Sequence, residues 1–316
     1  MGKFIIKRVL ISIVVVFLVS VFAFSLMHIL PGDPARLSLG EEASQEDVDA
    51  LREELNLNKP VLEQYFIWIN GIFRGDFGQS IQYHRPVLDI MQERLPRTVA
   101  IGLPTLVIST IIGIAFGIIS AIRRGKFIDQ VITFLATIGM GTPVFWIGIL
   151  GIYLFAMRLG ILPIQGFTSP TEDFAKYVHQ AILPVFCLST HQVASVSRQT
   201  RTNMLDVINQ DYIRTAKANG IRPSSIVFKH ALRNALIPIV TVIAMQVRMV
   251  IGGSLIVEQV FNIAGIGQLL QTAVGNRDYL IVQGAVLVIS LVTVGCNLLV
   301  DILYGVVDPR IRKTQR

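Results

Sequence analysis

Apolar segments long enough to cross a bilayer alternate with polar segments along most of the chain. The first of them, Val9–Leu30, holds 22 residues without a charge. A helix of that length spans about 33 Å, enough for the hydrocarbon core of a membrane. Six such segments predict an all-α, polytopic membrane protein with about six transmembrane helices. The other predicted spans are Val99–Ile122, Val131–Met157, Ala181–Ser197, Ala235–Val257 and Ile281–Val306.

The fourth predicted span is the least apolar of the six. Polar side chains inside a membrane face other helices or water rather than lipid, so this span is expected to lie against protein or a hydrated pathway. His191 and Gln192 are candidates for the wall of that pathway, although a packed, hydrogen-bonded position suits His191 better than a role as a ligand. The polar residues of the span are Ser189, Thr190, His191, Gln192, Ser195 and Ser197.

Arg248 lies near the middle of the fifth predicted span. An arginine at that depth costs about 2.5–3.5 kcal/mol on insertion scales, so its side chain is expected to face protein or water. Thr241, Ala244 and Gly252 share its helical face, which is small and polar. Two interpretations stay open. The face lines a translocation pathway, where the guanidinium meets carboxylate or carbonyl groups, or it forms a close contact with a neighbouring subunit.

The polar segment between the fourth and fifth spans carries a helical pattern of its own. Gly220 interrupts that pattern as a C-terminal glycine cap does, and Pro223 stands where a second helix can begin. The segment is therefore predicted to form a helix, a sharp turn and another helix. It carries seven Lys and Arg against Asp206 and Asp211, which favours the cytoplasmic face. The apolar residues at helical spacing before the break are Met204, Leu205, Ile208, Tyr212 and Ala216.

Residues 31–97 form the longest polar region, with seven Lys and Arg against twelve Asp and Glu. Its negative balance favours the outer face of the membrane. Ser44 is expected to cap a short helix, and the aromatic-rich Tyr65–Phe73 to lie at a membrane interface. Pro86–Leu95 is expected to form a short helix leading into the membrane. The predicted organisation is a tail and first span (1–30), an extracytoplasmic region (31–97), a five-helix core (98–306) with a cytoplasmic loop (198–234), and a basic tail (307–316).

Composition and charge distribution support a membrane protein with this topology. The chain is 52% hydrophobic and 16% charged, with a formal net charge of +7, whereas ordinary soluble domains carry about 25% charged residues. The segments predicted inside hold 17 Lys and Arg, and those predicted outside hold 9. This excess predicts that both termini are cytoplasmic, and it explains the positive charge without a nucleic-acid partner.

Residues that would indicate catalysis or cofactor binding are missing from the sequence. The five histidines are scattered without metal-ligand spacing, and Cys187 and Cys296 both fall in apolar segments. Gly125-Lys126 lacks the first glycine and the Ser or Thr of a nucleotide-binding loop. The chain is therefore expected to bind no metal or cofactor and not to hydrolyse ATP by itself.

The run Tyr212–Ala216, the glycine at Gly220 and seven further motifs along the chain together resemble those of the membrane permease subunits of dipeptide, oligopeptide and nickel ABC importers, a family that includes glutathione importers. Tyr212–Ala216 resembles the Tyr-(Ile/Met)-Arg-Thr-Ala run of this branch. Arg214 and Thr215 stand where the general signature has Glu and Ala, and Gly220 stands at its glycine. The remaining motifs are LPGDPA (30–35), LREELNLNKP (51–60), GDFGQS (75–80), LRNALIPIVT (232–241), GGSLIVEQVF (252–261), GIGQLL (265–270) and RDY (277–279).

The resemblance implies a type I ABC importer permease fold in a bacterial or archaeal cytoplasmic membrane. It implies a second, homologous permease subunit, two ATPase subunits that carry ATP and Mg, and an extracytoplasmic solute-binding protein. It further implies that Asn209–Gly220 forms a coupling helix that docks into the ATPase. The candidate coupling residues are Tyr212, Arg214, Thr215, Ala216 and Gly220.

The alternative function is a self-sufficient secondary transporter or channel. Such a protein is expected to show paired repeats and broken helices in corresponding halves, and neither pattern is evident in this sequence. An enzyme is a more distant alternative. The cargo stays open between dipeptides, longer peptides, glutathione and a nickel chelate, as does whether the second permease is a copy of this chain.

Overall fold

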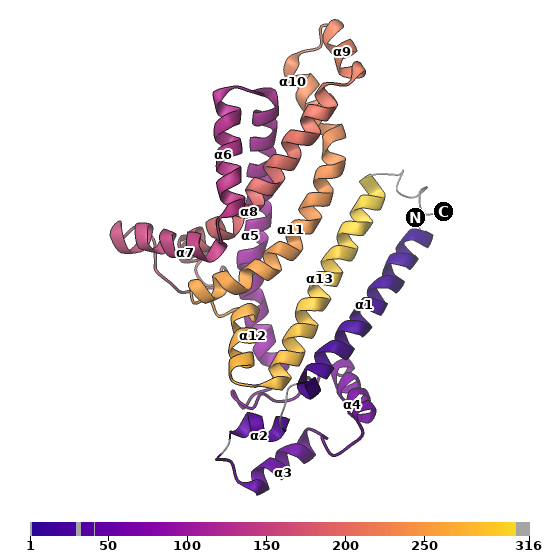
Figure 1. The fold of residues 1–316 in the computed structure, drawn as a ribbon, viewed down its shortest axis with the longest axis vertical. Helices are drawn as coiled ribbons and strands as arrows, with labels where there is room; N and C mark the ends of the chain where they lie inside the picture. Colours follow the sequence, from indigo (N-terminus) through magenta and orange to yellow (C-terminus); the bar gives the residue numbers. More distant parts are fainter. Residues whose placement is uncertain (1, 30–32, 41, 308–316) are drawn as a thin grey trace. The chain divides into compact units, whose positions relative to one another are not determined.

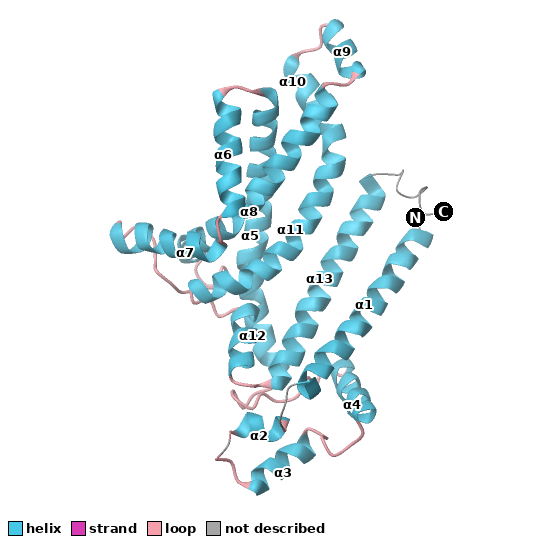
Figure 2. Ribbon diagram, in the orientation of Figure 1, coloured by secondary structure: helices cyan, strands magenta, loops and turns pink. Residues whose placement is uncertain are grey.

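The computed structural model describes residues 2–29, 33–40 and 42–307, which form helices joined by turns (Figures 1 and 2). Among these residues the only β pairing is an isolated bridge between Gln79 and Pro86. The chain divides into two compact units, one made of residues 99–263 with 299 onward, the other of residues 2–98 and 264–298. The long helices are α1 (Gly2–Ile29), α5 (Val87–Ile122), α8 (Phe174–Ile208), α11 (Leu232–Val260) and α13 (Tyr279–Val307).

Within the described residues, four helices are long and apolar enough to cross a membrane, or five if the bent pair described below counts as one span. The four contain Ile5–Ile29, Val87–Ile122, Thr241–Val260 and Tyr279–Leu299. The all-α class of the protein is confirmed. The number of six spans stays a prediction, because α8 is a long helix but is not apolar enough to be counted with the others.

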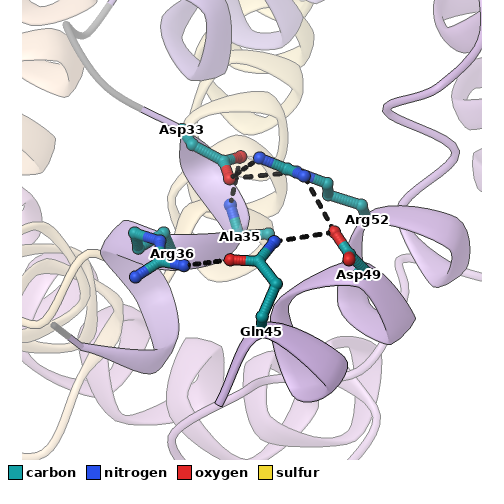
Figure 3. Close-up of polar contacts among 6 residues, drawn as sticks. All are labelled: Asp33, Ala35, Arg36, Gln45, Asp49 and Arg52. Atoms are coloured by element: carbon teal, nitrogen blue, oxygen red, sulfur yellow. Dashed lines mark hydrogen bonds and ion pairs between the residues drawn. The ribbon is translucent and has the colours of Figure 1, made fainter. Parts of the chain in front are cut away.

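In the unit that holds the N-terminal residues, a charged network joins two short helices, α2 (Pro34–Leu39) and α3 (Gln45–Glu54) (Figure 3). Asp33 caps α2 by accepting from the Ala35 N–H at 3.2 Å. Arg52 of α3 donates to the same carboxylate at 3.0 and 2.7 Å and to Asp49 at 2.8 Å. Ser44 accepts from the Asp47 N–H at 3.1 Å, so the predicted helix cap is confirmed.

Helix α4 (Val61–Phe73) packs its aromatic residues against α1 in the same unit. The Tyr65 ring lies 5.5 Å from that of Phe24, and its hydroxyl lies 2.8 Å from the Ser20 Oγ. The aromatic segment predicted for a membrane interface thus uses part of its apolar surface to hold α4 on α1.

Helix α5 runs without interruption from Val87 to Ile122. A helix is present at the predicted position Pro86–Leu95, but its predicted end was wrong, because the helix continues through Pro96 into the second predicted span. Packing explains why the first turns persist. Val87 and Met91 are buried in one core with Ile266 of α12 (Ile266–Gly275) and Ile281 of α13.

The third predicted span is not a straight helix. α6 (Phe127–Gly141) is followed by α7 (Val144–Gly151) and a π-helical segment η1 (Ile152–Arg158), with a bend of 103° between the two halves. Pro143 causes the break: it lacks an N–H and disfavours a helical residue before it. Thr142 accordingly has extended backbone angles, φ −93° and ψ 127°.

Helices α5 and α8 approach closely in the unit built on residues 99–263. A Cβ added to Gly113 would lie 2.6 Å from the Val196 Cβ, and one added to Gly117 would lie 2.4 Å from the Thr200 Cβ. The two glycines stand four residues apart, the spacing that lets membrane helices pack backbone to backbone. α8 also packs along α11 and α6 in this unit.

Candidate functional site

The segment predicted to couple the chain to an ATPase forms a compact set of short helices. It comprises α9 (Asp211–Ala218), α10 (Pro223–Ser225) and a π-helical segment η2 (Ile226–Ala231), and it joins α8 to α11 (Figure 1). The predicted first helix is interrupted earlier than expected. α8 ends at Ile208 and Gln210 is extended, with ψ 152°, so that α9 begins as a separate helix.

Gly220 ends α9 in the way that the sequence predicts. Its φ of +73° lies in the left-handed region that favours glycine. The Ile221 N–H donates to the Ala216 carbonyl at 3.2 Å, and the Gly220 N–H to that of Lys217 at 3.0 Å. Together these bonds make a Schellman cap. Pro223 occupies the first turn of α10, so the predicted turn between two helices is confirmed.

α9 has a buried face and an exposed face. Ile213 and Ala216 are buried in a core with Met204 and Val207 of α8 and Ile118 of α5. This core anchors α9 to the ends of both long helices. The exposed residues of the predicted coupling set are Tyr212, Arg214, Thr215 and Gly220.

Four of the five predicted coupling residues are therefore accessible to a partner, and Ala216 instead holds α9 on the chain itself. The Tyr212 hydroxyl accepts from the Asn234 Nδ2 of α11 at 2.8 Å, which fixes the ring beside the turn. Sequence periodicity missed Phe228 of η2, whose side chain is 62% exposed. An apolar ring of that exposure beside α9 is a further candidate contact.

The predicted pathway residues divide between two environments. Gln192 is buried, and its Oε1 accepts from Ser109 of α5 at 3.1 Å, so this bond joins α8 to α5. His191 is half-buried on α8, whereas Thr241 and Arg248 are exposed on α11. The structure therefore does not gather the four residues into one surface.

Two methionines flank the exposed arginine of α11. Met245 and Met249 are 57% and 59% exposed, and Gly252 is exposed one turn further on. Methionine is flexible and polarisable, and it is common on surfaces that accept varied partners. The sequence placed Arg248 on a small polar face and did not single out these neighbours.

A cavity of about 790 Å³ lies between α5, α6, α7 and α8. Its lining is mainly apolar and includes Phe116, Trp146, Phe155 and Phe186. None of the four predicted pathway residues lines it. Apolar walls suit hydrocarbon or a neighbouring helix better than a hydrated polar solute.

No group of three or more His, Cys, Asp or Glu that could hold a metal ion is present among the residues that the structure describes. Cys187 and Cys296 are both free thiols.

Comparison with known families gives two matches that together cover nearly the whole chain. A family model described as "binding-protein-dependent transport system inner membrane component" matches residues 113–313. A second model, for the N-terminal part of such membrane components, matches residues 1–102.

Curated relatives align over almost their full length. A probable peptide ABC transporter permease of Sinorhizobium fredii is 41% identical over 99% of this chain and 100% of its own. The oligopeptide transport system permease AppB of Bacillus subtilis is 39% identical, covering 98% of this chain and 99% of its own. The glutathione transport system permease GsiC of Escherichia coli is also 39% identical, with 99% of both chains covered.

A solved structure shares the fold. An inward-facing crystal form of the methionine ABC transporter MetNI contains a chain that aligns with a TM-score of 0.54 and 16% identity. The alignment covers 69% of this chain and 96% of the other.

Proposed function

The chain belongs to the family of binding-protein-dependent transport system inner membrane components and is a permease subunit of an ABC importer; from that premise we propose that it forms half of a pathway for peptides or similar small solutes. The relatives are named for peptides, oligopeptides and glutathione. These solutes share amide groups and free carboxylates, so a pathway that accepts them must tolerate varied side chains while meeting the same polar groups.

The observation that carries the proposal is the anchored helix α9. Its buried face is packed on the ends of α5 and α8, its C-terminus is closed by the Gly220 cap, and its other face is exposed. A helix anchored in this way can be displaced by the movement of a bound partner without unfolding. We assign Tyr212, Arg214 and Thr215 of the exposed face to contact with an ATPase subunit.

In this proposal α9 lies on the cytoplasmic side, and α2 and α3 lie outside, where a solute-binding protein delivers cargo. Both termini are cytoplasmic. Two ATPase subunits bind ATP and Mg and supply the energy, and a second permease subunit completes the pathway. This chain binds no nucleotide; it supplies the membrane helices and the surface that receives the ATPase movement.

Purification of the tagged chain together with its transporter tests this assignment. ATPase subunits are expected to co-purify, and their ATP hydrolysis to rise when the loaded solute-binding protein is added. This chain purified alone is expected to hydrolyse no ATP. Uptake driven by an ion gradient in vesicles that contain only this chain would overturn the proposal and support a secondary transporter.

Replacing Arg248 by glutamine is expected to slow import of peptides with a free C-terminal carboxylate by about 10-fold, because a hydrogen bond to a charged group is lost. Import of the same peptides with an amidated C-terminus is expected to change little. Initial uptake rates in vesicles that contain the assembled transporter measure both. Binding of the ATPase subunits is checked in the same samples.

The variant Arg248→Lys is the matched control, since it keeps the charge, and it is expected to retain the preference for carboxylates in part. If Arg248→Gln lowers the two uptake rates equally, or releases the ATPase subunits, Arg248 serves packing between subunits instead.

A further inference from the structure

A buried carboxylate lies at the start of α6, outside the sites described above. Asp129 is only 4% exposed. It accepts from the Gly125 N–H at 2.9 Å and from the Nε and Nη2 of Arg201 at 2.8 and 2.9 Å. The Ser120 hydroxyl also donates to it. These donors satisfy both carboxylate oxygens, so the charge is stable where it is buried.

The donors come from α5, from the α5–α6 turn and from α8, whose Arg201 is 72 residues away in the sequence. Ser120 is in the last turn of α5, Gly125 is in the α5–α6 turn with φ +74°, and Arg201 is on α8. Arg201 holds the carboxylate with two nitrogens, a geometry that fixes orientation as well as distance. The network therefore ties the start of α6 and its turn to α8.

The same part of α8 is packed against α9. Arg201 lies about two turns before the end of α8. The residues that follow it, Met204 and Val207, share a buried core with Ile213 of α9. Gly117 of α5 meets Thr200 of α8 beside the same arginine. A displacement of α9 thus reaches Arg201 through packed side chains.

We propose that the Asp129–Arg201 pair makes α6 follow α9, so that movement received from the ATPase reaches the bent helix pair α6–α7. The proposal rests on the coupling role assigned to α9 above. Asp129 and Arg201 are positioning residues in this scheme. The hydrophobic core moves the ends of α5 and α8 with α9, and the ion pair adds α6 to that moving group.

Asp129→Asn and Arg201→Lys in the complete reconstituted transporter test the proposal. Both variants are expected to bind ATPase subunits and to keep ATP hydrolysis stimulated by the solute-binding protein. Cargo imported per ATP hydrolysed is expected to fall by about 5-fold or more, the low end of typical coupling effects. Arg198→Lys is the matched control, since Arg198 is exposed one turn earlier on α8 and is expected to leave the ratio unchanged.

A distance measurement gives a second readout. Loss of a purely structural contact would not make this distance depend on ATP binding. Spin labels replace the exposed residues Lys126, at the start of α6, and Ser224 of α10, in a chain without its two cysteines. In the otherwise unchanged transporter the distance between the labels is expected to stay constant between nucleotide-free and ATP-bound states. With Asp129→Asn it is expected to change on ATP binding.

Unchanged import per ATP in both variants would overturn the inference, as would an ATP-dependent distance with the ion pair intact.

If the single variants fail to assemble, the double variant Asp129→Asn, Arg201→Gln removes both charges. Recovery of assembly with low import per ATP supports the proposal, whereas recovery of both, or of neither, contradicts it. Failure of the proposed function itself is distinct, because ATPase subunits would then not bind the unmodified chain.

Discussion

Replacing Gly220 by valine is expected to remove most ATP-driven import while the protein still reaches the membrane. A non-glycine residue at φ +73° costs about 1–2 kcal/mol, and a β-branched side chain is especially unfavourable there. The strain opposes the two capping bonds that close α9 onto Lys217 and Ala216. Import rate and stimulated ATP hydrolysis in membrane vesicles, each normalised to the amount of chain present, measure the loss.

Gly220→Asn is the matched control for this prediction. Asparagine tolerates the left-handed region better than other residues, so it is expected to keep most of the import activity. A Cβ at this position meets no atom within 4 Å in this chain, so steric crowding inside the permease does not explain a loss. Normal import by Gly220→Val would defeat the assignment of α9. Equal loss in the two variants would indicate that the partner surface at Gly220 matters rather than its backbone conformation.

Replacing Gly117 by alanine is expected to destabilise the packing of α5 on α8 and to lower the yield of assembled transporter. The new Cβ would lie 2.4 Å from the Thr200 Cβ and 2.7 Å from the Ser197 carbonyl oxygen. Overpacking of this kind costs about 1–3 kcal/mol, and backbone atoms cannot move aside as a side-chain end can. The midpoint of thermal unfolding of the purified protein in detergent is the measurement.

The control for Gly117 is Gly295→Ala in α13, where an added Cβ meets nothing within 4 Å. It is expected to leave the unfolding midpoint unchanged or slightly higher, because alanine is the better helix former. The double variant Gly117→Ala, Thr200→Gly is expected to recover part of the loss, since it removes the side chain that crowds the new methyl. An unchanged midpoint in Gly117→Ala would show that the two helices do not pack at this crossing.

Features that depend on a few neighbouring residues were predictable from the sequence. Ser44 has a hydroxyl at the start of a helical segment, Gly220 ends one, and Pro223 begins another; the structure confirms all three. Each depends on the chemistry of one turn of backbone, so the rest of the fold does not override it.

Features set by tertiary packing were not predictable in this way. The break at Asn209–Gln210 has neither Gly nor Pro to announce it, and it separates α8 from α9 because α9 packs on the end of α5. Pro143 could be recognised inside an apolar segment of the sequence, but the bend of 103° between α6 and α7 could not be predicted from it. Asp129 and Arg201 are 72 residues apart, and nothing near either of them in the sequence indicates the other.

The polarity of α8 has a consequence for how the protein is made. A helix enters the bilayer from the translocon by itself only if it is apolar enough, and α8 is not among the helices that meet that condition. Its partners in α5 and α6 precede it in the chain, including Ser109, which bonds Gln192. Those helices leave the ribosome first and are already present when α8 emerges. We therefore predict that order of synthesis supplies the polar helix with hydrogen-bond partners at the moment of insertion, and that α8 enters the membrane as part of a group.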